Sequence, residues 1–232
     1  ISTVVFDMDG VITDTASVHR VAWKSLFDDY LRSRSEQTGE EFVEFTETDY
    51  LTYVDGKRRE DGVASFLTSR GIDPVTDLVN DLATRKNDYF LTIVDRDGVT
   101  EFGDTIAFIR GLQDAGVATA LITASRNAVP VLGGAGLLDL FEVRVDGIVA
   151  RELDLPGKPA PDVFLEAMRR VGGEIGSTAI VEDAVSGVQA GRNGDFALVI
   201  GVNREDAVHG ERLADNGADI VVTSMDQVSV QP

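Results

Sequence analysis

Short apolar runs recur at wide intervals along the chain, and each ends in polar or small residues. They cover 3–6, 118–122, 143–145, 179–181, 197–200 and 220–222. From about residue 102 onward, helical patterns separate the runs. These patterns cover 104–115, 127–135, 160–171, 185–194 and 205–215. Continuous apolar strands that alternate with helices predict a parallel sheet covered on both faces. Ligands bind such sheets at the carboxyl ends of the strands.

Residues 17–94 show a different pattern, with no convincing strand. Val18, Ala22 and Trp23 fit one apolar helical face, and helices are expected over 61–70 and 77–94. The polar, acidic stretch 32–49 predicts a helix with loose flanks. The region 201–217 is expected to hold a polar helix at the surface.

These patterns predict an α/β fold with a Rossmann-like parallel-sheet core. The core domain is expected to comprise residues 1–16 and 95–232. A helical domain, 17–94, is expected to be inserted directly after the first strand. The length of 232 residues is sufficient for this two-domain arrangement and for a large apolar core.

Charge and composition limit the classes of function. Forty acidic residues against 21 basic ones give a net charge of −19, which argues against nonspecific binding to nucleic acid or anionic membrane. The chain has no cysteine, so disulfides and thiolate chemistry are excluded. No apolar run approaches the roughly 18 residues of a membrane span, and no signal-peptide pattern is visible. We expect a monomeric cytoplasmic protein.

Two predicted strands end in paired carboxylates. Asp7 and Asp9 follow the first strand, with Gly10 allowing a sharp backbone turn, and Glu182 and Asp183 follow another. Such acids can also be ordinary turn or capping residues. Four carboxylates at one sheet edge would repel one another unless a cation neutralised them. Their hard oxygen ligands suit Mg²⁺, so the sequence predicts a Mg²⁺ site.

Two further segments carry anion-binding groups. Thr123 and Ser125 end a strand beside Arg126 and Asn127 at an expected helix start, which favours phosphate. Lys158 precedes a proline at a loop-to-helix junction; a lone lysine can equally be a solvated surface charge. Two acid pairs, a hydroxyl and a lysine fit phosphoryl transfer through an aspartate nucleophile.

These motifs, in order, resemble the four motifs of the haloacid dehalogenase superfamily, and the insertion resembles its helical cap domain. The resemblance implies that Asp7 is a nucleophile that forms an aspartyl-phosphate. It implies that Asp9 is the general acid and base, with its backbone carbonyl on Mg²⁺. Glu182 and Asp183 would complete the metal site together with Asp7. The resemblance assigns the transferring phosphate to Thr123 and Lys158.

Further segments are similar to the β-phosphoglucomutase-like subfamily. They are Gly10–Thr15, His19, Ala22–Lys24, Gly56, Arg59–Asp61, Arg85–Asp88, Ser125–Asn127 and Lys158–Phe164. The resemblance assigns a second, non-transferring phosphate to Arg59, assisted by Ser125, Arg126 and Asn127. It assigns sugar contacts and coupling of cap closure to proton transfer to His19 and Lys86. Gly10, Trp23 and Gly56 are further substrate-binding candidates.

Purely structural interpretations of some of these residues stay open. Trp23 fits the core of the helical domain, and Arg59 belongs to a basic run that could be a solvated face. Lys86 could be an ordinary helix-surface charge. Asp55 and Arg126 both replace lysines of the subfamily pattern, a difference that bears on the identity of the sugar more than on the chemistry.

The resemblance implies an enzyme that interconverts β-glucose 1-phosphate and glucose 6-phosphate, with Mg²⁺ and with glucose 1,6-bisphosphate as phosphodonor. The first alternative is a phosphatase of the same fold acting on a small sugar phosphate; it would need no second phosphate site. A phospho-accepting signalling module would not need the helical insertion. A protein that only binds sugar phosphate would not need both Asp7 and Asp9. Fold alone does not decide between these functions.

Overall fold

The computed structural model describes residues 1–229. The chain divides into two compact units, which we call the α/β unit and the helical unit. The α/β unit comprises Ile1–Asp14, Gly56–Arg58 and Val99–Pro232, and the helical unit comprises Thr15–Asp55 and Arg59–Gly98. The last three residues of the predicted core domain, 230–232, lie outside the described residues. The assignment of 17–94 as a cap domain stays a prediction.

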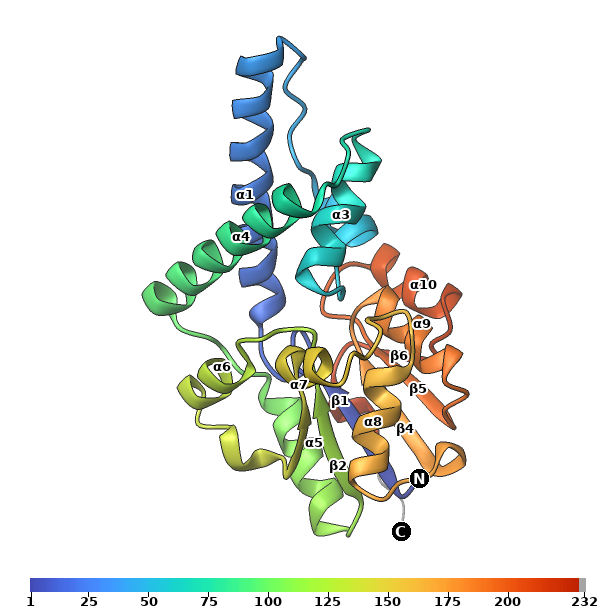
Figure 1. Ribbon diagram of the computed structural model, residues 1–232. Coiled ribbons are helices and arrows are strands. Elements are labelled where there is room, and N and C mark those ends of the chain that lie inside the picture. The colour runs from blue at the N-terminus through green and yellow to red at the C-terminus, as the bar shows by residue number, and fades with distance from the viewer. Residues whose placement is uncertain (230–232) are drawn as a thin grey trace. The chain divides into compact units, whose positions relative to one another are not determined.

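Six parallel strands form the sheet of the α/β unit (Figure 1), in the order β3-β2-β1-β4-β5-β6. Their bounds are β1 Thr3–Asp7, β2 Ala118–Ile122, β3 Val143–Val145, β4 Thr178–Glu182, β5 Leu198–Val202 and β6 Ile220–Val222. Each expected strand is present, and the predicted parallel α/β fold is confirmed. The strands are rich in β-branched residues because both of their faces are buried.

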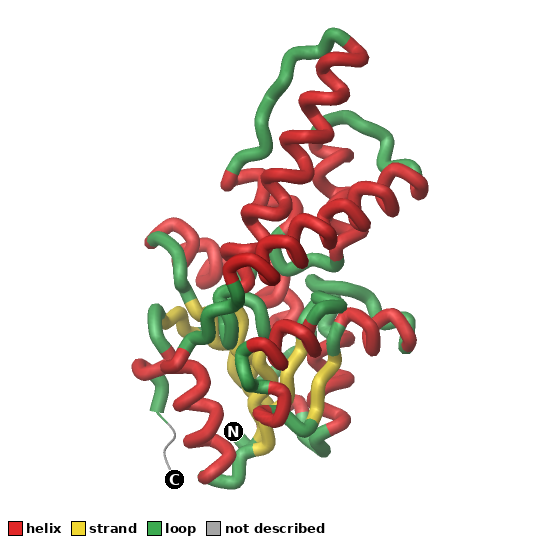
Figure 2. The backbone as a smooth tube through the Cα atoms, turned by 90° about the vertical axis from the view of Figure 1, so that its left-hand side faces the viewer, coloured by secondary structure: helices red, strands yellow, loops and turns green. Residues whose placement is uncertain are grey.

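Helices cover both faces of this sheet, and Figure 2 shows the strands between them. Along β1, Val5 belongs to the apolar cluster that includes Phe164 of α8, whereas the ring of Phe6 contacts Phe108 of α5. Because neighbouring strand residues point to opposite faces, α5 and α8 lie on opposite sides of the sheet. The helices of this unit are α5 Gly103–Asp114, α6 Ala128–Gly134, α7 Gly147–Glu152, α8 Asp162–Arg170, α9 Val185–Asn193 and α10 Ala207–Asp215. Three short turns, η2 Leu138–Leu140, η3 Ile175–Ser177 and η4 Met225–Gln227, complete the unit.

The strand order reverses between β1 and β4, which are neighbours in the sheet although 170 residues separate their ends. The register pairs Phe6 with Val181, so the residues that follow each of them leave the sheet at the same edge. This is the switch point at which open parallel sheets bind their ligands.

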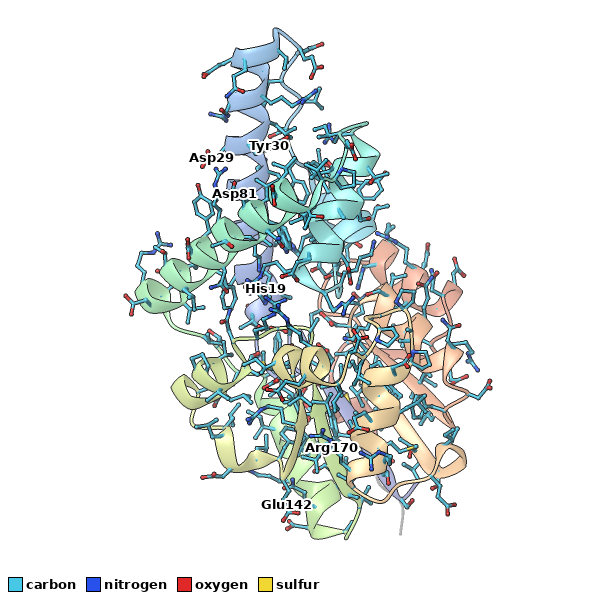
Figure 3. All side chains as sticks on the ribbon, in the orientation of Figure 1. His19, Asp29, Tyr30, Asp81, Glu142 and Arg170 are labelled. Atoms are coloured by element: carbon cyan, nitrogen blue, oxygen red, sulfur yellow. The ribbon has the colours of Figure 1, made fainter. Side chains whose placement is uncertain are left out.

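The helical unit contains α1 Thr15–Thr38, α2 Glu47–Asp49, a π-helical turn η1 Tyr50–Val54, α3 Arg59–Ser69 and α4 Thr76–Asp97. Its core is aromatic. Phe27 stacks on Trp23 and also contacts Phe45 and Phe66, with centroid distances between 4.1 and 5.3 Å. The expected apolar face of the first helix therefore packs into this core. Asp29 and Tyr30, labelled in Figure 3, lie further along α1.

Two local predictions were wrong, and one helix was missed. The stretch 32–49 is not one helix: α1 continues to Thr38 and a loop precedes α2. The loop is fixed by tertiary contacts, since Phe45 is buried and its amide donates to Asp28 at 2.8 Å. Helix α7 was not predicted. Helix α10 is not a lone surface helix, because it packs against β5 and β6 and buries Leu213. No helix among residues 1–229 is both long enough and apolar enough to cross a membrane.

Candidate active site

The carboxyl end of β1 presents two acidic side chains. Asp7 is the last residue of the strand and is 4% exposed. Asp9 is half-buried in the turn that follows, which is closed by the amide of Gly10 donating to the carbonyl of Thr13 at 2.8 Å. The strand therefore fixes Asp7, and the turn fixes Asp9 close enough for the two charges to interact.

Lys158 links β1 to β4. Its Nζ donates to Asp7 Oδ1 at 2.6 Å and to Glu182 Oε1. The side chain is nearly fully buried, in the loop that precedes α8. The predicted lysine is thus not a solvated surface charge, and it joins two carboxylates that lie 175 residues apart in the chain.

Electrostatics in this cluster favour a cation. Burial raises the pKa of Asp7 well above its usual range, and the charges of Glu182 and Asp9 raise it further against the opposing effect of Lys158. Burial alone would lower the pKa of Lys158, but Asp7 and Glu182 outweigh it and raise that pKa. Lys158 supplies one positive charge against the three carboxylates of Asp7, Asp9 and Glu182.

Two glycines make room for the acidic pair after β4. Gly10 has φ +78°, and a Cβ there would lie 1.7 Å from Oδ2 of Asp183. A Cβ at Gly187 would lie 1.9 Å from Oε1 of Glu182. Any larger residue at either position would displace a carboxylate. The sequence indicated the first glycine, but the role of Gly187 depends on packing that the sequence does not reveal.

Three carboxylates can share one metal ion. Ligand oxygens of Asp7, Glu182 and Asp183 all lie within 4.8 Å of one another. The donors are all hard oxygen atoms, so the arrangement fits Mg²⁺. The carboxylate of Asp9 accepts a hydrogen bond from Thr123 instead. The resemblance assigns the backbone carbonyl of Asp9, and not its carboxylate, to the metal.

A chain of hydroxyl contacts orders the end of β2. Thr123 Oγ1 donates to Asp9 Oδ2 at 2.7 Å and accepts from the Ser125 amide at 2.9 Å. Ser125 Oγ in turn accepts from the Asn127 amide at 3.1 Å. The amides of Ser125 and Asn127 are therefore engaged by hydroxyls of their own loop. Arg126 is half-buried between them.

The candidates of the helical unit form two groups. His19, near the start of α1 (Figure 3), stacks on Phe90 and accepts a hydrogen bond from Lys86 at Nδ1. Lys86 is 3% exposed, and its Nζ lies 5.1 Å from the ring centroid of Trp23. Lys86 is thus not an ordinary surface charge, and Trp23 belongs to the aromatic core.

Arg59 forms the second group. Its Nη2 donates to Asn87 Oδ1 at 2.8 Å and its Nη1 to the carbonyl of Ala83 at 3.4 Å, so α4 holds the guanidinium in place. The phosphate role of Arg59 stays a prediction.

The segment Gly56–Arg58 belongs to the α/β unit although helical-unit residues flank it in sequence. A Cβ at Gly56 would lie 2.4 Å from Ser186 Oγ, in the first turn of α9. Arg58 donates to the carbonyl of Leu155, two residues before Gly157 in the loop that carries Lys158. No role for Arg58 was predicted, because no local sequence pattern indicates a contact with a residue so distant in the chain.

Known proteins of one family resemble this chain over most of its length. The model of the family "haloacid dehalogenase-like hydrolase" matches residues 1–195. A β-phosphoglucomutase of Mycobacterium bovis is 46% identical over 232 residues, which cover 95% of this chain and 88% of the relative. A β-phosphoglucomutase of Bacillus subtilis is 30% identical over 237 residues, covering 98% and 92%. The crystal structure of a β-phosphoglucomutase from Clostridium difficile has a TM-score of 0.78 at 22% identity, covering 99% and 93%.

The chain therefore belongs to the haloacid dehalogenase-like hydrolase family, in its β-phosphoglucomutase-like branch. The resemblance of the motifs is confirmed, and so is the prediction that the chain is an enzyme of the phosphotransferase or isomerase kind.

Proposed function

We propose that this chain is a Mg²⁺-dependent β-phosphoglucomutase that works through an aspartyl-phosphate on Asp7. The observation that carries the proposal is the buried contact of Lys158 with Asp7 and Glu182, beside Asp183. This cluster joins a potential nucleophile, a fixed cation and a metal-binding donor set at the switch point of the sheet. The names of the relatives from Mycobacterium bovis and Bacillus subtilis support the choice of substrate.

The first half of the cycle begins with phosphorylated Asp7. The sugar 6-hydroxyl of β-glucose 1-phosphate attacks phosphorus, and the bond from phosphorus to the Asp7 oxygen breaks. Asp9 takes the hydroxyl proton. The products of this half are glucose 1,6-bisphosphate and the free Asp7 carboxylate.

The second half returns the phosphoryl group after the bisphosphate has turned round. Asp7 attacks the phosphorus on the 1-position, the bond from phosphorus to O1 breaks, and Asp9 gives its proton to O1. Glucose 6-phosphate leaves and Asp7 is phosphorylated again. Glucose 1,6-bisphosphate is therefore also the phosphodonor that starts the cycle.

The surrounding residues hold these groups in place. Thr123 fixes the Asp9 carboxylate by its hydrogen bond, and Lys158 aligns Asp7. Bound Mg²⁺ would neutralise the carboxylates and the oxygens of the transferring group. For the non-transferring phosphate we propose Arg59 in the helical unit and Ser125, Arg126 and Asn127 in the α/β unit. For sugar contacts we propose Gly10, His19, Gly56 and Lys86; Trp23 belongs to the aromatic core and adjoins Lys86.

A phosphorus NMR time course tests the proposal. The sample contains β-glucose 1-phosphate, Mg²⁺ and a trace of glucose 1,6-bisphosphate. We expect glucose 6-phosphate to grow without free phosphate. Free phosphate without the isomer would contradict the mutase and indicate a phosphatase of small sugar phosphates.

A further inference from the structure

His209 is a buried polar residue that the proposed mechanism does not use. It is one of only two histidines in the chain, it lies in the first turn of α10, and it is 4% exposed. Its Nε2 lies 2.8 Å from the backbone carbonyl oxygen of Asp183. A carbonyl oxygen can only accept, so the hydrogen of this bond is on Nε2.

A histidine is an unexpected residue at this buried position because its other ring nitrogen is left without a partner among the described residues. Nδ1 is buried and has no hydrogen-bond partner among residues 1–229. Burying an unsatisfied polar atom costs about 1–3 kcal/mol, so an apolar side chain would fill this space at lower free-energy cost. The contact with Asp183 is the one polar interaction of the ring among the described residues that can offset this cost.

The backbone around His209 fixes where the ring lies. Its amide donates to Oδ1 of Asp206, the N-cap residue of α10, at 2.9 Å. Asn203, at the end of β5, donates from Nδ2 to the carbonyl of Asp206 at 2.8 Å. The ring is therefore tied to the sheet through the turn between β5 and α10.

The carboxylate of Asp183 has little room to move. Its carboxylate lies so close to Gly10 that a single Cβ there would overlap it. Its oxygen lies within 4.8 Å of ligand oxygens of Asp7 and Glu182. A rotation of the peptide group of Asp183 would move this carboxylate, and His209 holds the carbonyl of that peptide group.

We propose that His209 is a positioning residue for the metal site. By donating from Nε2 to the Asp183 carbonyl, it fixes the backbone of Asp183 and so aims the carboxylate at the shared site. The inference deepens the proposed function and rests on its Mg²⁺ site. It assigns no contact between His209 and metal or substrate.

The tautomer of His209 is a first measurement. With two histidines in the chain, long-range ¹H–¹⁵N NMR spectra give two ring patterns, and the one missing in His209→Leu belongs to His209. We expect a hydrogen on Nε2 in the full chain. An Nδ1–H tautomer would overturn the proposal, because Nε2 could not then donate.

The decisive experiment is calorimetric titration of Mg²⁺ into the full chain, with no substrate present. His209→Leu removes the donor, whereas His209→Gln keeps an N–H group at a similar reach. Leu213→Ala is the matched control, since it removes buried apolar contacts of α10 and leaves the hydrogen bonds of the His209 amide and ring in place. Thermal unfolding of each variant without metal measures the purely structural effect.

We expect His209→Leu to weaken Mg²⁺ binding by about tenfold or more, as loss of groups that orient metal ligands does. His209→Gln is expected to restore most of the affinity, and Leu213→Ala to keep it despite a lowered melting temperature. Equal Mg²⁺ affinity in His209→Leu and wild type overturns the role of His209 and leaves the proposed function standing. A wild-type chain that binds no Mg²⁺ overturns the metal site itself, and this inference with it.

Discussion

The α/β unit and the helical unit place their polar candidates by different means. In the α/β unit, Asp7, Lys158 and Glu182 come from three distant segments and bond to one another at the ends of neighbouring strands. In the helical unit, His19 and Lys86 are held against aromatic rings on α1 and α4. The register of a parallel sheet fixes the first group, whereas packing between helices fixes the second.

We therefore expect substitutions in the two units to have different effects. The carboxylates of the α/β unit fit against glycines with no space to spare, so small changes there should affect the chemical step. The helical unit holds its cations on a large aromatic core, so changes to a single polar side chain should affect recognition of the substrate more than the chemistry. The following substitutions test that separation.

Asp7→Asn should have the largest effect, a loss of turnover of at least ~10⁴-fold, because the proposed nucleophile is removed. The melting temperature without metal should not fall, since burial disfavours the charge of Asp7, as its raised pKa indicates. A coupled assay and circular dichroism measure the two quantities. Asp139→Asn, at an exposed acid, is the control and should change neither. Retained turnover in Asp7→Asn would sink the assignment.

Lys158→Met should reduce turnover by about 10³-fold, because the fixed cation beside the nucleophile is lost. It should also destabilise the α/β unit by about 3–5 kcal/mol, since two buried carboxylates lose their partner. Urea unfolding gives the free energy of unfolding. Lys24→Met, at a lysine with a half-exposed side chain in the helical unit, should leave both nearly unchanged. Similar stability losses in the two variants would break the comparison between the units.

Arg59→Ala should reduce mutase turnover by roughly 10²-fold and leave hydrolysis of a small aryl phosphate nearly unchanged. The reason is that Arg59 is proposed to hold only the non-transferring phosphate, which an aryl phosphate lacks. Steady-state kinetics with both substrates measure the split. Arg34→Ala, at an arginine paired with Glu40 in the same unit, is the control. Equal losses on both substrates would count against a second phosphate site.

Asp104→Asn should have the smallest effect on turnover and a moderate effect on stability, about 2 kcal/mol at pH 7. Burial would raise the pKa of Asp104, but hydrogen bonds from the Met225 amide, Arg204 and Ser224 outweigh it and lower that pKa. A lowered pKa stabilises the fold above the usual value near 4, and this contribution is lost as pH falls through the folded-state pKa.

The difference in unfolding free energy between wild type and Asp104→Asn should therefore shrink in acid, as urea titrations at pH 7 and below pH 4 would measure. Asp97 offers the contrast from the helical unit: Arg96 lowers its pKa as well, but the pair is exposed to solvent. Asp97→Asn should give no measurable change at either pH. A difference in unfolding free energy between wild type and Asp104→Asn that stays constant with pH would contradict this account.

The sequence predicted the sheet and most of the candidate site for one physical reason. Apolar runs such as 118–122 and 143–145 are continuous because both faces of the strands are buried, and polar residues can follow only where each strand ends. Since parallel strands end at one edge, Asp7 and Glu182 could be placed together without coordinates. Their contact with Lys158 does not follow from that reasoning, because Lys158 lies in the loop before α8 and not at a strand end.

Other features depend on contacts that no local pattern contains. The segment 39–46 is acidic, and burial of Phe45 and its hydrogen bond to Asp28 hold it as a loop. Helix α7 begins Gly-Ile-Val and continues from a strand, and the buried cap Asp146 decides its conformation by accepting from the amides of Ile148 and Val149. Likewise, the role proposed for His209 depends on its contact with the carbonyl of Asp183, 26 residues away in the chain.

The claim that the α/β unit performs the chemistry at Asp7 is tested most directly by locating the phosphoryl group. The protein is mixed with Mg²⁺ and glucose 1,6-bisphosphate, quenched rapidly in acid and digested for peptide mass spectrometry. We predict one phosphoryl group on the peptide that contains Asp7, at Asp7 itself, and none in Asp7→Asn. A phosphoryl group on any other residue, or turnover by wild type with no phosphorylated peptide at all, would contradict the account.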